Sequence, residues 1–252
     1  MKASVLITGG SGGSGLFMAR HFAARGMNVF LTSREEKDAD SAAEAVSRDF
    51  PDIICKGYQS SVGNEDHVIA MFEDIRALGC LVTSAVLNAA DLGIGMDVLT
   101  VQLADFMRVI ETNLGWNFSI ARQAALHMID AGGGSIVFVG SNTYQRAIKG
   151  RVAYVASKGG IVSLAKALAV ELGQYKIRVN TLVPGSIKTV RWEAISEEAQ
   201  NAKKSRLPIG DIADFEDMAN AAYFLANNLS KNVTGTELLL DGGAGAQLFP
   251  GT

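Results

Sequence analysis

The feature that most restricts the fold of this chain is a regular alternation of short apolar runs with longer stretches of helical spacing. The apolar runs are rich in Val, Ile and Leu and mostly do not alternate with polar residues, which is typical of strands covered on both faces. Strands and helices that alternate along a chain indicate a parallel sheet with right-handed crossovers. We find no linker, repeat or low-complexity segment, and we therefore predict one doubly wound α/β domain over residues 1–252.

The spacing of the apolar residues sets the bounds that we expect for each element. The first predicted helix, for example, places Leu16, Ala19, Phe22 and Ala23 on one face and stops at Gly26. The sequence predicts strands at 3–7, 28–33, 53–59, 133–141, 177–185 and 236–243, and one strand within 81–90. It predicts helices at 15–26, 38–50, 64–79, 103–130, 152–175 and 214–229, the fourth of them bent. The sheet should therefore be mostly seven-stranded and parallel, and flanked by helices.

The charge and the scarcity of metal ligands exclude several classes of function. The 252 residues carry a net charge of −3 and no cluster of Lys or Arg, so we do not expect a nucleic-acid partner. His21, His67 and His127 lie far apart and away from Cys55 and Cys80, so we expect no metal site and two free thiols. No 18-residue uncharged apolar stretch is present, so we expect no membrane partner and a cytoplasmic location.

A glycine-rich loop, LITGGSGGSGLF, follows the first predicted strand and opens the first predicted helix. Its spacing, Thr-Gly-x3-Gly-x-Gly, differs from the common G-x-G-x-x-G. Glycines permit positive φ and a close approach of the backbone, and a helix N-terminus offers free N–H groups to phosphate. The loop therefore predicts a dinucleotide site, with a flexible tight turn as the alternative. The cofactor-binding residues expected here are Thr8, Gly9, Ser11, Gly13, Ser14 and Gly15.

The end of the second predicted strand should meet the adenosine ribose of such a cofactor. A carboxylate there favours NAD, whereas an arginine suits the 2′-phosphate of NADP. The strand ends in Thr32, Ser33 and Arg34, and the acids Glu35 and Glu36 come only afterwards. Arg34 can pair with a phosphate through two N–H groups, and Ser33 can donate a further hydrogen bond. We therefore favour NADP(H), with NAD(H) as the alternative.

Tyr154 and Lys158 stand four residues apart in a predicted helix and therefore share one face. Ser141 ends the fifth predicted strand, where open α/β sheets bind their ligands. Asn113 lies in the helix that is expected to bend. Taken singly, each has an ordinary structural explanation: a packed tyrosine, a solvated lysine, a strand-end cap and a helix-surface asparagine.

With these residues and the segments TGGSGGSG, NAA, YVASK and PGSIKT, the chain resembles the short-chain dehydrogenase/reductase family over essentially its whole length. The resemblance implies a Rossmann-type fold and a catalytic tetrad of Asn113, Ser141, Tyr154 and Lys158. It implies that Tyr154 is the general acid/base of an alcohol–ketone interconversion and that Ser141 binds the substrate oxygen. Lys158 would lower the phenol pKa from its usual value of about 10 and hold the nicotinamide ribose. Asn113 would distort its helix and hold a water linking Lys158 to solvent.

The resemblance also implies further cofactor contacts. Asn88 would close the floor of the cofactor site, but the family motif N-N-A-G reads NAAD here, so Ala89 and Asp91 depart from it. Ser61 stands where the family often has an Asp against adenine. The expected cofactor-binding residues outside the glycine loop are Ser33, Arg34, Ser61, Asn88, Ala89, Tyr154, Lys158, Pro184, Gly185, Ile187 and Thr189.

The segment at about 186–210 falls where the family places its substrate lid. Trp192 either packs over an apolar substrate or anchors an amphipathic helix to the body, and the sequence leaves both open. The expected substrate pocket comprises Ser141, Tyr144, Gln145, Tyr154 and Trp192. We expect a free small or hydrophobic alcohol or ketone as the substrate. The resemblance further implies a homotetramer or a homodimer, paired through the two longest helices.

Two other functions compete with this interpretation. Family members that reduce 3-oxoacyl groups on carrier protein tend to carry basic residues just before the serine-bearing strand, whereas 128–135, MIDAGGGS, has no Lys or Arg. This argues against a carrier-protein substrate. The other alternative is a regulatory protein that senses a nucleotide without catalysis. Such a protein has no need to keep Ser141, Tyr154 and Lys158 together, so the sequence favours the enzyme.

Overall fold

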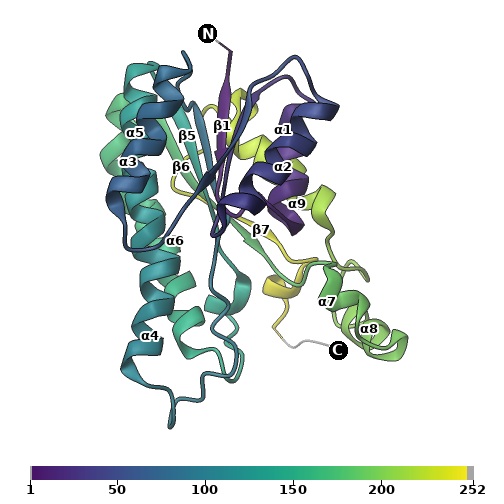
Figure 1. Ribbon diagram of the computed structural model, residues 1–252. Coiled ribbons are helices and arrows are strands. Elements are labelled where there is room, and N and C mark those ends of the chain that lie inside the picture. The colour runs from purple at the N-terminus through teal and green to yellow at the C-terminus, as the bar shows by residue number, and fades with distance from the viewer. Residues whose placement is uncertain (1, 249–252) are drawn as a thin grey trace.

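The computed structural model describes residues 2–248, which form helices on both sides of one seven-stranded parallel sheet (Figure 1). The strand order is β3-β2-β1-β4-β5-β6-β7, so the order reverses between β1 and β4. This confirms the predicted doubly wound fold, and it places a topological switch point at the carboxyl ends of β1 and β4. The strands are β1 (Ser4–Ile7), β2 (Asn28–Ser33), β3 (Cys55–Gln59), β4 (Ser84–Leu87), β5 (Gly134–Val139), β6 (Ile177–Pro184) and β7 (Glu237–Leu240).

The helices cover the two faces of the sheet in separate layers (Figure 1). One layer consists of α1 (Gly13–Ala23), α2 (Glu36–Asp49) and α9 (Phe215–Ala226). The other consists of α3 (Glu65–Ala77), α5 (Trp116–Asp130) and α6 (Val152–Leu172), with α4 (Leu103–Ile110) leading into α5. Each predicted helix is therefore present, with ends that differ by a few residues.

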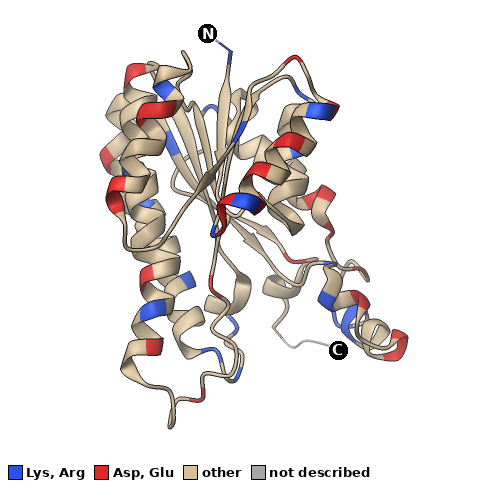
Figure 2. Cartoon of the chain, in the orientation of Figure 1, with Lys and Arg blue, Asp and Glu red and all other residues tan. Residues whose placement is uncertain are grey.

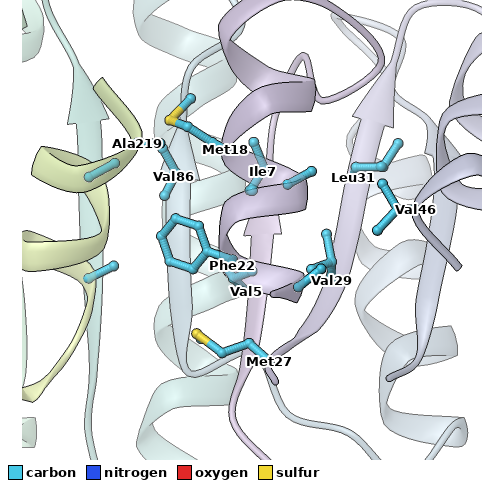
Figure 3. Close-up of a cluster of buried hydrophobic side chains, with 14 of the residues drawn as sticks. Val5, Ile7, Met18, Phe22, Met27, Val29, Leu31, Val46, Val86 and Ala219 are labelled. Atoms are coloured by element: carbon cyan, nitrogen blue, oxygen red, sulfur yellow. The ribbon is translucent and has the colours of Figure 1, made fainter. Parts of the chain in front are cut away.

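The alternation of side chains along β1 explains why the strands read as continuous apolar runs. Val5 and Ile7 point into the cluster beneath α1 and α2, where they meet Phe22 (Figure 3). Leu6 points the other way, into the cluster that contains Phe30. All five side chains are fully buried, and each such burial contributes about 1.5–3 kcal/mol. Charged residues lie mostly on the helices and loops rather than on the strands (Figure 2).

Strand β4 ends at Leu87 because the chain leaves the sheet to wrap around Thr8. The Thr8 hydroxyl accepts hydrogen bonds from the backbone N–H groups of Asn88 and Ala89, both at 2.9 Å. The strand is therefore shorter than the segment 81–90 in which it was expected. The loop that follows lies directly beside the glycine-rich loop.

The bend expected in the fourth helix is a π-helical turn, Glu111–Gly115, between α4 and α5. The N–H of Trp116 bonds to the carbonyl of Glu111, five residues earlier. Asn113 lies in the middle of this turn and is fully buried. Such turns occur frequently at functional sites.

The segment predicted as a lid contains two short helices, α7 (Val190–Glu193) and α8 (Glu197–Lys204), which lie beyond the edge of the sheet (Figure 1). The Lys188 N–H bonds to the Ala213 carbonyl at 2.9 Å, and the Lys188 ammonium pairs with Asp211 at 2.9 Å. These contacts join the beginning of the segment to the residues that follow its end.

One stretch, Val152–Tyr175, is long and apolar enough to cross a membrane by length and composition alone. It contains α6, which packs against β6, and Ile161 and Ala165 of this helix belong to the buried core. The apolar side chains of α6 thus pack against the sheet.

Candidate active site

The carboxyl ends of β1, β4 and β5 bring three predicted site residues to one edge of the sheet. Thr8 follows β1, Asn88 follows β4 and Ser141 comes two residues after β5. The Asn88 amide donates to the Thr8 carbonyl at 3.3 Å and accepts from the Ser14 hydroxyl at 3.2 Å. Asn88 therefore joins the end of β4 to the first turn of α1.

The glycine-rich loop makes a close turn that only glycine can occupy. Gly9 has a φ of +65° and Gly13 a φ of +51°. A Cβ on Gly15 would lie 2.0 Å from the Gly9 carbonyl oxygen. Gly12 is the N-cap of α1 and provides no side-chain cap, so the first N–H groups of the helix are left for a ligand. These features fit the pyrophosphate of a dinucleotide.

The end of β2 carries polar groups next to this loop. The hydroxyls of Ser11 and Ser33 are hydrogen-bonded at 2.9 Å. The Arg34 carbonyl accepts from the Gln59 amide at 3.0 Å, which fixes the backbone while the Arg34 side chain is exposed. Within residues 2–248, Arg34 has no ion-pair partner, which leaves its guanidinium available for an anionic ligand.

Tyr154 and Lys158 lie one turn apart on α6, as the spacing predicted. The Lys158 nitrogen is 5.5 Å from the centroid of the Tyr154 ring and donates to the Val139 carbonyl at 2.7 Å. Lys158 is only 2% exposed, and this burial lowers its pKa to about 8. The ammonium is thus held in place by a neutral group and is close to losing its proton at mildly alkaline pH.

The Tyr154 phenol is subject to opposing influences. Burial raises its pKa, while a hydrogen bond with Ser141 and the positive charge of Arg151 lower it. Ser141 in turn accepts from the Thr143 N–H at 3.3 Å and from the Thr143 hydroxyl at 3.0 Å. These two bonds hold the Ser141 hydroxyl in place at the site.

Asn113 is brought to this site through the loop after β4. Its amide oxygen accepts from the Asp91 N–H at 2.7 Å, and its amide nitrogen donates to the Asp91 carbonyl and the Ser157 hydroxyl, both at 2.9 Å. Asn113 is thus joined through Ser157 to α6, the helix that carries Tyr154 and Lys158, while both of its amide N–H groups are engaged by Asp91 and Ser157.

Asp91, which the sequence marked only as a departure from the family motif, connects two further groups. One carboxylate oxygen accepts from the Gly93 N–H at 2.9 Å, and the other forms an ion pair with Arg108 of α4. The Arg151 guanidinium donates to the Leu92 carbonyl of the same loop at 2.8 Å. Sequence reasoning missed Arg108, and it named Arg151 only as a cation that a charged substrate could recruit, without placing it beside Tyr154. The position of Arg151, three residues before Tyr154, was the available signal.

Three residues predicted for the substrate pocket contact other parts of the protein. The Tyr144 hydroxyl bonds to the Glu237 carboxylate of β7 and accepts from the Gln145 amide at 2.6 Å. Trp192 is 8% exposed, and the ammonium of Lys203 on α8 lies 5.7 Å from its ring centroid. Trp192 thus packs within the lid segment, and the contact of these three residues with a substrate stays a prediction.

The remaining predicted cofactor residues lie in two loops. Gly185 follows β6, and a Cβ there would lie 2.9 Å from the Asp241 Cβ, so the close approach to β7 requires glycine. Ile187 pairs with Ala213 as an isolated bridge, and Thr189 is the N-cap of α7. Ser61 follows β3, and its carbonyl accepts from the Asn64 N–H at 3.3 Å. Contacts of these residues with a cofactor also remain predictions.

Comparisons with known proteins agree with this geometry. A family model described as enoyl-(acyl carrier protein) reductase matches residues 10–245. The 3-oxoacyl-[acyl-carrier-protein] reductase FabG of Chlamydia muridarum is 34% identical over 245 residues, which cover 96% of this chain and 97% of the relative. The 3alpha-hydroxysteroid dehydrogenase of Mediterraneibacter gnavus is 30% identical over 240 residues, with 95% of each chain covered.

A solved structure is similar to this chain in its three-dimensional fold. The crystal structure of a putative gluconate dehydrogenase from Agrobacterium tumefaciens superposes with a TM-score of 0.89 at 30% identity. The match covers 98% of this chain and 97% of that one. The chain therefore belongs to the short-chain dehydrogenase/reductase family of oxidoreductases.

Proposed function

We propose that this protein uses NADP(H) to interconvert a secondary alcohol and a ketone on a free small or hydrophobic substrate. The observation that carries the proposal is the convergence of Ser141, Tyr154 and Lys158 beside a glycine loop that fits a dinucleotide. A protein that only senses a nucleotide has no use for this buried lysine beside a phenol. Burying a charged group is costly, and it is retained where the chemistry needs it.

Each side chain has a defined task in ketone reduction. The cofactor, when bound, supplies the hydride. Tyr154 donates its phenolic proton to the substrate oxygen, and the Ser141 hydroxyl donates a hydrogen bond to the same oxygen. The Lys158 ammonium, 5.5 Å from the Tyr154 ring centroid, stabilises the phenolate that remains. Alcohol oxidation uses the same groups in reverse, with Tyr154 as the base.

The preference for NADP(H) rests on the end of β2. Ser33 and the exposed Arg34 stand where the adenosine ribose would lie, and no carboxylate precedes Arg34 on the strand. A guanidinium without an ion-pair partner suits a 2′-phosphate. NAD(H) is the alternative cofactor.

The charges in the segment before β5 support the proposal that the substrate is free rather than bound to a carrier protein. Asp130 is the one charged residue of segment 128–135, and it forms an ion pair with Arg76 at 2.6 Å. An acidic carrier protein would find no unpaired cation on that segment. The relatives point to both substrate classes, because one is named for acyl-carrier-protein substrates and another for a steroid. Reduction of 3-oxoacyl groups on carrier protein is therefore the second candidate.

The test is a fluorescence-monitored NADPH oxidation screen with three arms. The first contains free small ketones, the second contains hydrophobic ketones including steroids, and the third contains acetoacetyl-carrier protein. We expect turnover in the first or second arm. Turnover confined to the third arm would favour the carrier-protein reductase. Tight NADPH binding without turnover in any arm would favour the nucleotide sensor.

We also propose that the protein is a cytoplasmic homotetramer or homodimer. Both Cys55 and Cys80 are free thiols, which agrees with a reducing compartment. The long helices carry exposed apolar residues, including Leu103 at 75% and Val170 at 84%, which a symmetric interface would cover. Light scattering coupled to size-exclusion chromatography measures the number of subunits.

A further inference from the structure

Arg151 is a second cation beside Tyr154 that lies outside the tetrad. It is the N-cap residue of α6 and stands three positions before Tyr154, on the same side of the helix. Its guanidinium carbon is 5.9 Å from the centroid of the Tyr154 ring. This distance is close to the 5.5 Å between the Lys158 nitrogen and the same centroid. Two cations of one helix therefore lie against one phenol.

Both the backbone and the side chain of Arg151 are fixed by the loop after β4. The guanidinium donates to the Leu92 carbonyl at 2.8 Å. The backbone of Arg151 pairs with Met96 as an isolated bridge, and the Met96 N–H bonds to the Gly150 carbonyl at 3.0 Å. The loop also contacts Tyr154 itself, since a Cβ on Gly93 would lie 3.5 Å from the Tyr154 Cβ. The position of the guanidinium is therefore set by the same loop that packs against the Cβ and backbone of Tyr154.

The charge of Arg151 is not neutralised by an acid. Across residues 2–248, no carboxylate oxygen lies within 4.0 Å of its guanidinium nitrogens. Asp91, the acid of the same loop, forms its ion pair with Arg108 and caps the Gly93 N–H. The partner of Arg151 is a neutral carbonyl, which positions the guanidinium without cancelling its field.

Arg151 differs from Lys158 in how its charge depends on pH. Burial lowers the pKa of Lys158 to about 8, so its positive charge weakens in mildly alkaline solution. An arginine side chain keeps its charge throughout the pH range in which enzymes work. Arg151 can therefore act on Tyr154 where Lys158 has begun to lose its proton.

Resting on the function proposed above, we propose that Arg151 is a positioning residue whose fixed charge stabilises the phenolate form of Tyr154. Arg151 affects the reaction electrostatically, through Tyr154. The Leu92 carbonyl holds the Arg151 guanidinium in place. Removal of the charge should then raise the pKa of Tyr154, because the deprotonated form loses a favourable neighbour.

Besides Arg151, the charged groups around Tyr154 are one cation, Lys158, and carboxylates that are already paired. Lys158 lies on α6, and Ser141, two residues after β5, is neutral. Asp91 and Arg108, from the loop and α4, are paired with each other. The phenol of Tyr144, from the turn after β5, bonds to the Glu237 carboxylate of β7, whose other oxygen pairs with Lys166 at 2.7 Å.

The decisive comparison is Arg151→Gln against Arg151→Lys and Lys149→Gln. Glutamine keeps an N–H donor for the Leu92 carbonyl but removes the charge, and lysine restores the charge. Lys149 is an exposed cation two residues away, so its replacement controls for a simple loss of net charge. The first readout is the pH dependence of kcat/KM for oxidation of the alcohol identified in the screen. The second is tyrosinate absorbance during alkaline titration, taken as the difference between each protein and the same protein carrying Tyr154→Phe.

We expect Arg151→Gln to move both the acidic limb of the oxidation profile and the Tyr154 titration upward by about one pH unit. On the acidic limb this equals about a tenfold loss of kcat/KM. Arg151→Lys should recover most of the loss, and Lys149→Gln should leave both curves in place. An unchanged Tyr154 titration in Arg151→Gln would overturn the proposal. A loss confined to KM, with an unmoved pH profile, would also overturn it by making Arg151 a substrate-binding group. The titration needs no substrate, so it tests Arg151 even if the screen finds no turnover.

Discussion

The side-chain amide of Asn113 binds both backbone groups of Asp91. The amide oxygen accepts the Asp91 N–H at 2.7 Å, and the amide nitrogen donates to the Asp91 carbonyl at 2.9 Å. Asn113 sits in the π-helical turn, while Asp91 belongs to the loop after β4, which packs against the Tyr154 Cβ at Gly93. The distorted helix and the loop beside Tyr154 are therefore joined by hydrogen bonds.

Replacement of Asn113 by alanine should weaken both the fold and the reaction. The change leaves two backbone groups of Asp91 and the Ser157 hydroxyl without their partner, which we expect to cost about 2–4 kcal/mol of unfolding free energy. Turnover should fall about tenfold or more, because the loop on Tyr154 loses its anchor. Urea unfolding and kcat measure the two effects. Thr112→Ala, in the same turn, is the control. Equal unfolding free energies for the two variants would contradict this account.

Arg34→Ala should change the preference between the two cofactors. Loss of a charge-assisted contact with the 2′-phosphate costs about 1.5–3 kcal/mol, so KM for NADPH should rise about tenfold or more. KM for NADH should change little, because NADH has no 2′-phosphate. Lys37→Ala removes an exposed positive charge three residues further on and serves as the control. A similar rise for both cofactors in Arg34→Ala would remove the basis for preferring NADP(H).

Lys158 should make the stability of the protein depend on pH in a defined direction. Its pKa is about 8 in the folded chain and 10.5 as the ordinary value, so between these values the unfolded chain binds more protons. Stability therefore rises with pH across this window, by about 3 kcal/mol relative to Lys158→Met. Below pH 8 the lysine is charged in both states and the difference is constant. Urea unfolding of both proteins at several pH values measures the difference between their unfolding free energies.

Lys166→Met is the control for this experiment, because Lys166 lies on the same helix and is 55% exposed. Its unfolding free energy should follow that of the wild type across the window. If the difference in unfolding free energy between wild type and Lys158→Met stays constant from pH 8 to 10.5, burial does not shift the Lys158 pKa.

The fold was predictable because its signals are local in the sequence. Strand β1 is apolar at every position since Val5 and Ile7 face one helix layer while Leu6 faces the other. The glycines at 9 and 15 are needed because their backbones meet, and this spacing is visible in the sequence. The apolar run of β1 and the glycine spacing can therefore be read from the sequence, because burial on both faces and close backbone contact each require these residue types.

The connections around the site were not predictable, because they depend on where side chains turn in a loop. Asp91 was recognised only as a departure from the motif, whereas its carboxylate joins Arg108 to the Gly93 N–H. The Tyr144 hydroxyl was expected in the substrate pocket but bonds to Glu237 from β7, ninety-three residues away. Such contacts join segments that share no periodic pattern.

The most direct test of the central claim is Tyr154→Phe, which removes one hydroxyl and keeps the ring. General acid/base catalysis contributes about 10²–10⁴-fold to a rate, so we predict that kcat falls by at least about a hundredfold. NADPH binding, followed by fluorescence, should be retained. Tyr175→Phe, on an exposed tyrosine just beyond the same helix, should leave both measurements unchanged. Unchanged turnover in Tyr154→Phe would contradict the assignment of Tyr154 as the group that moves the proton.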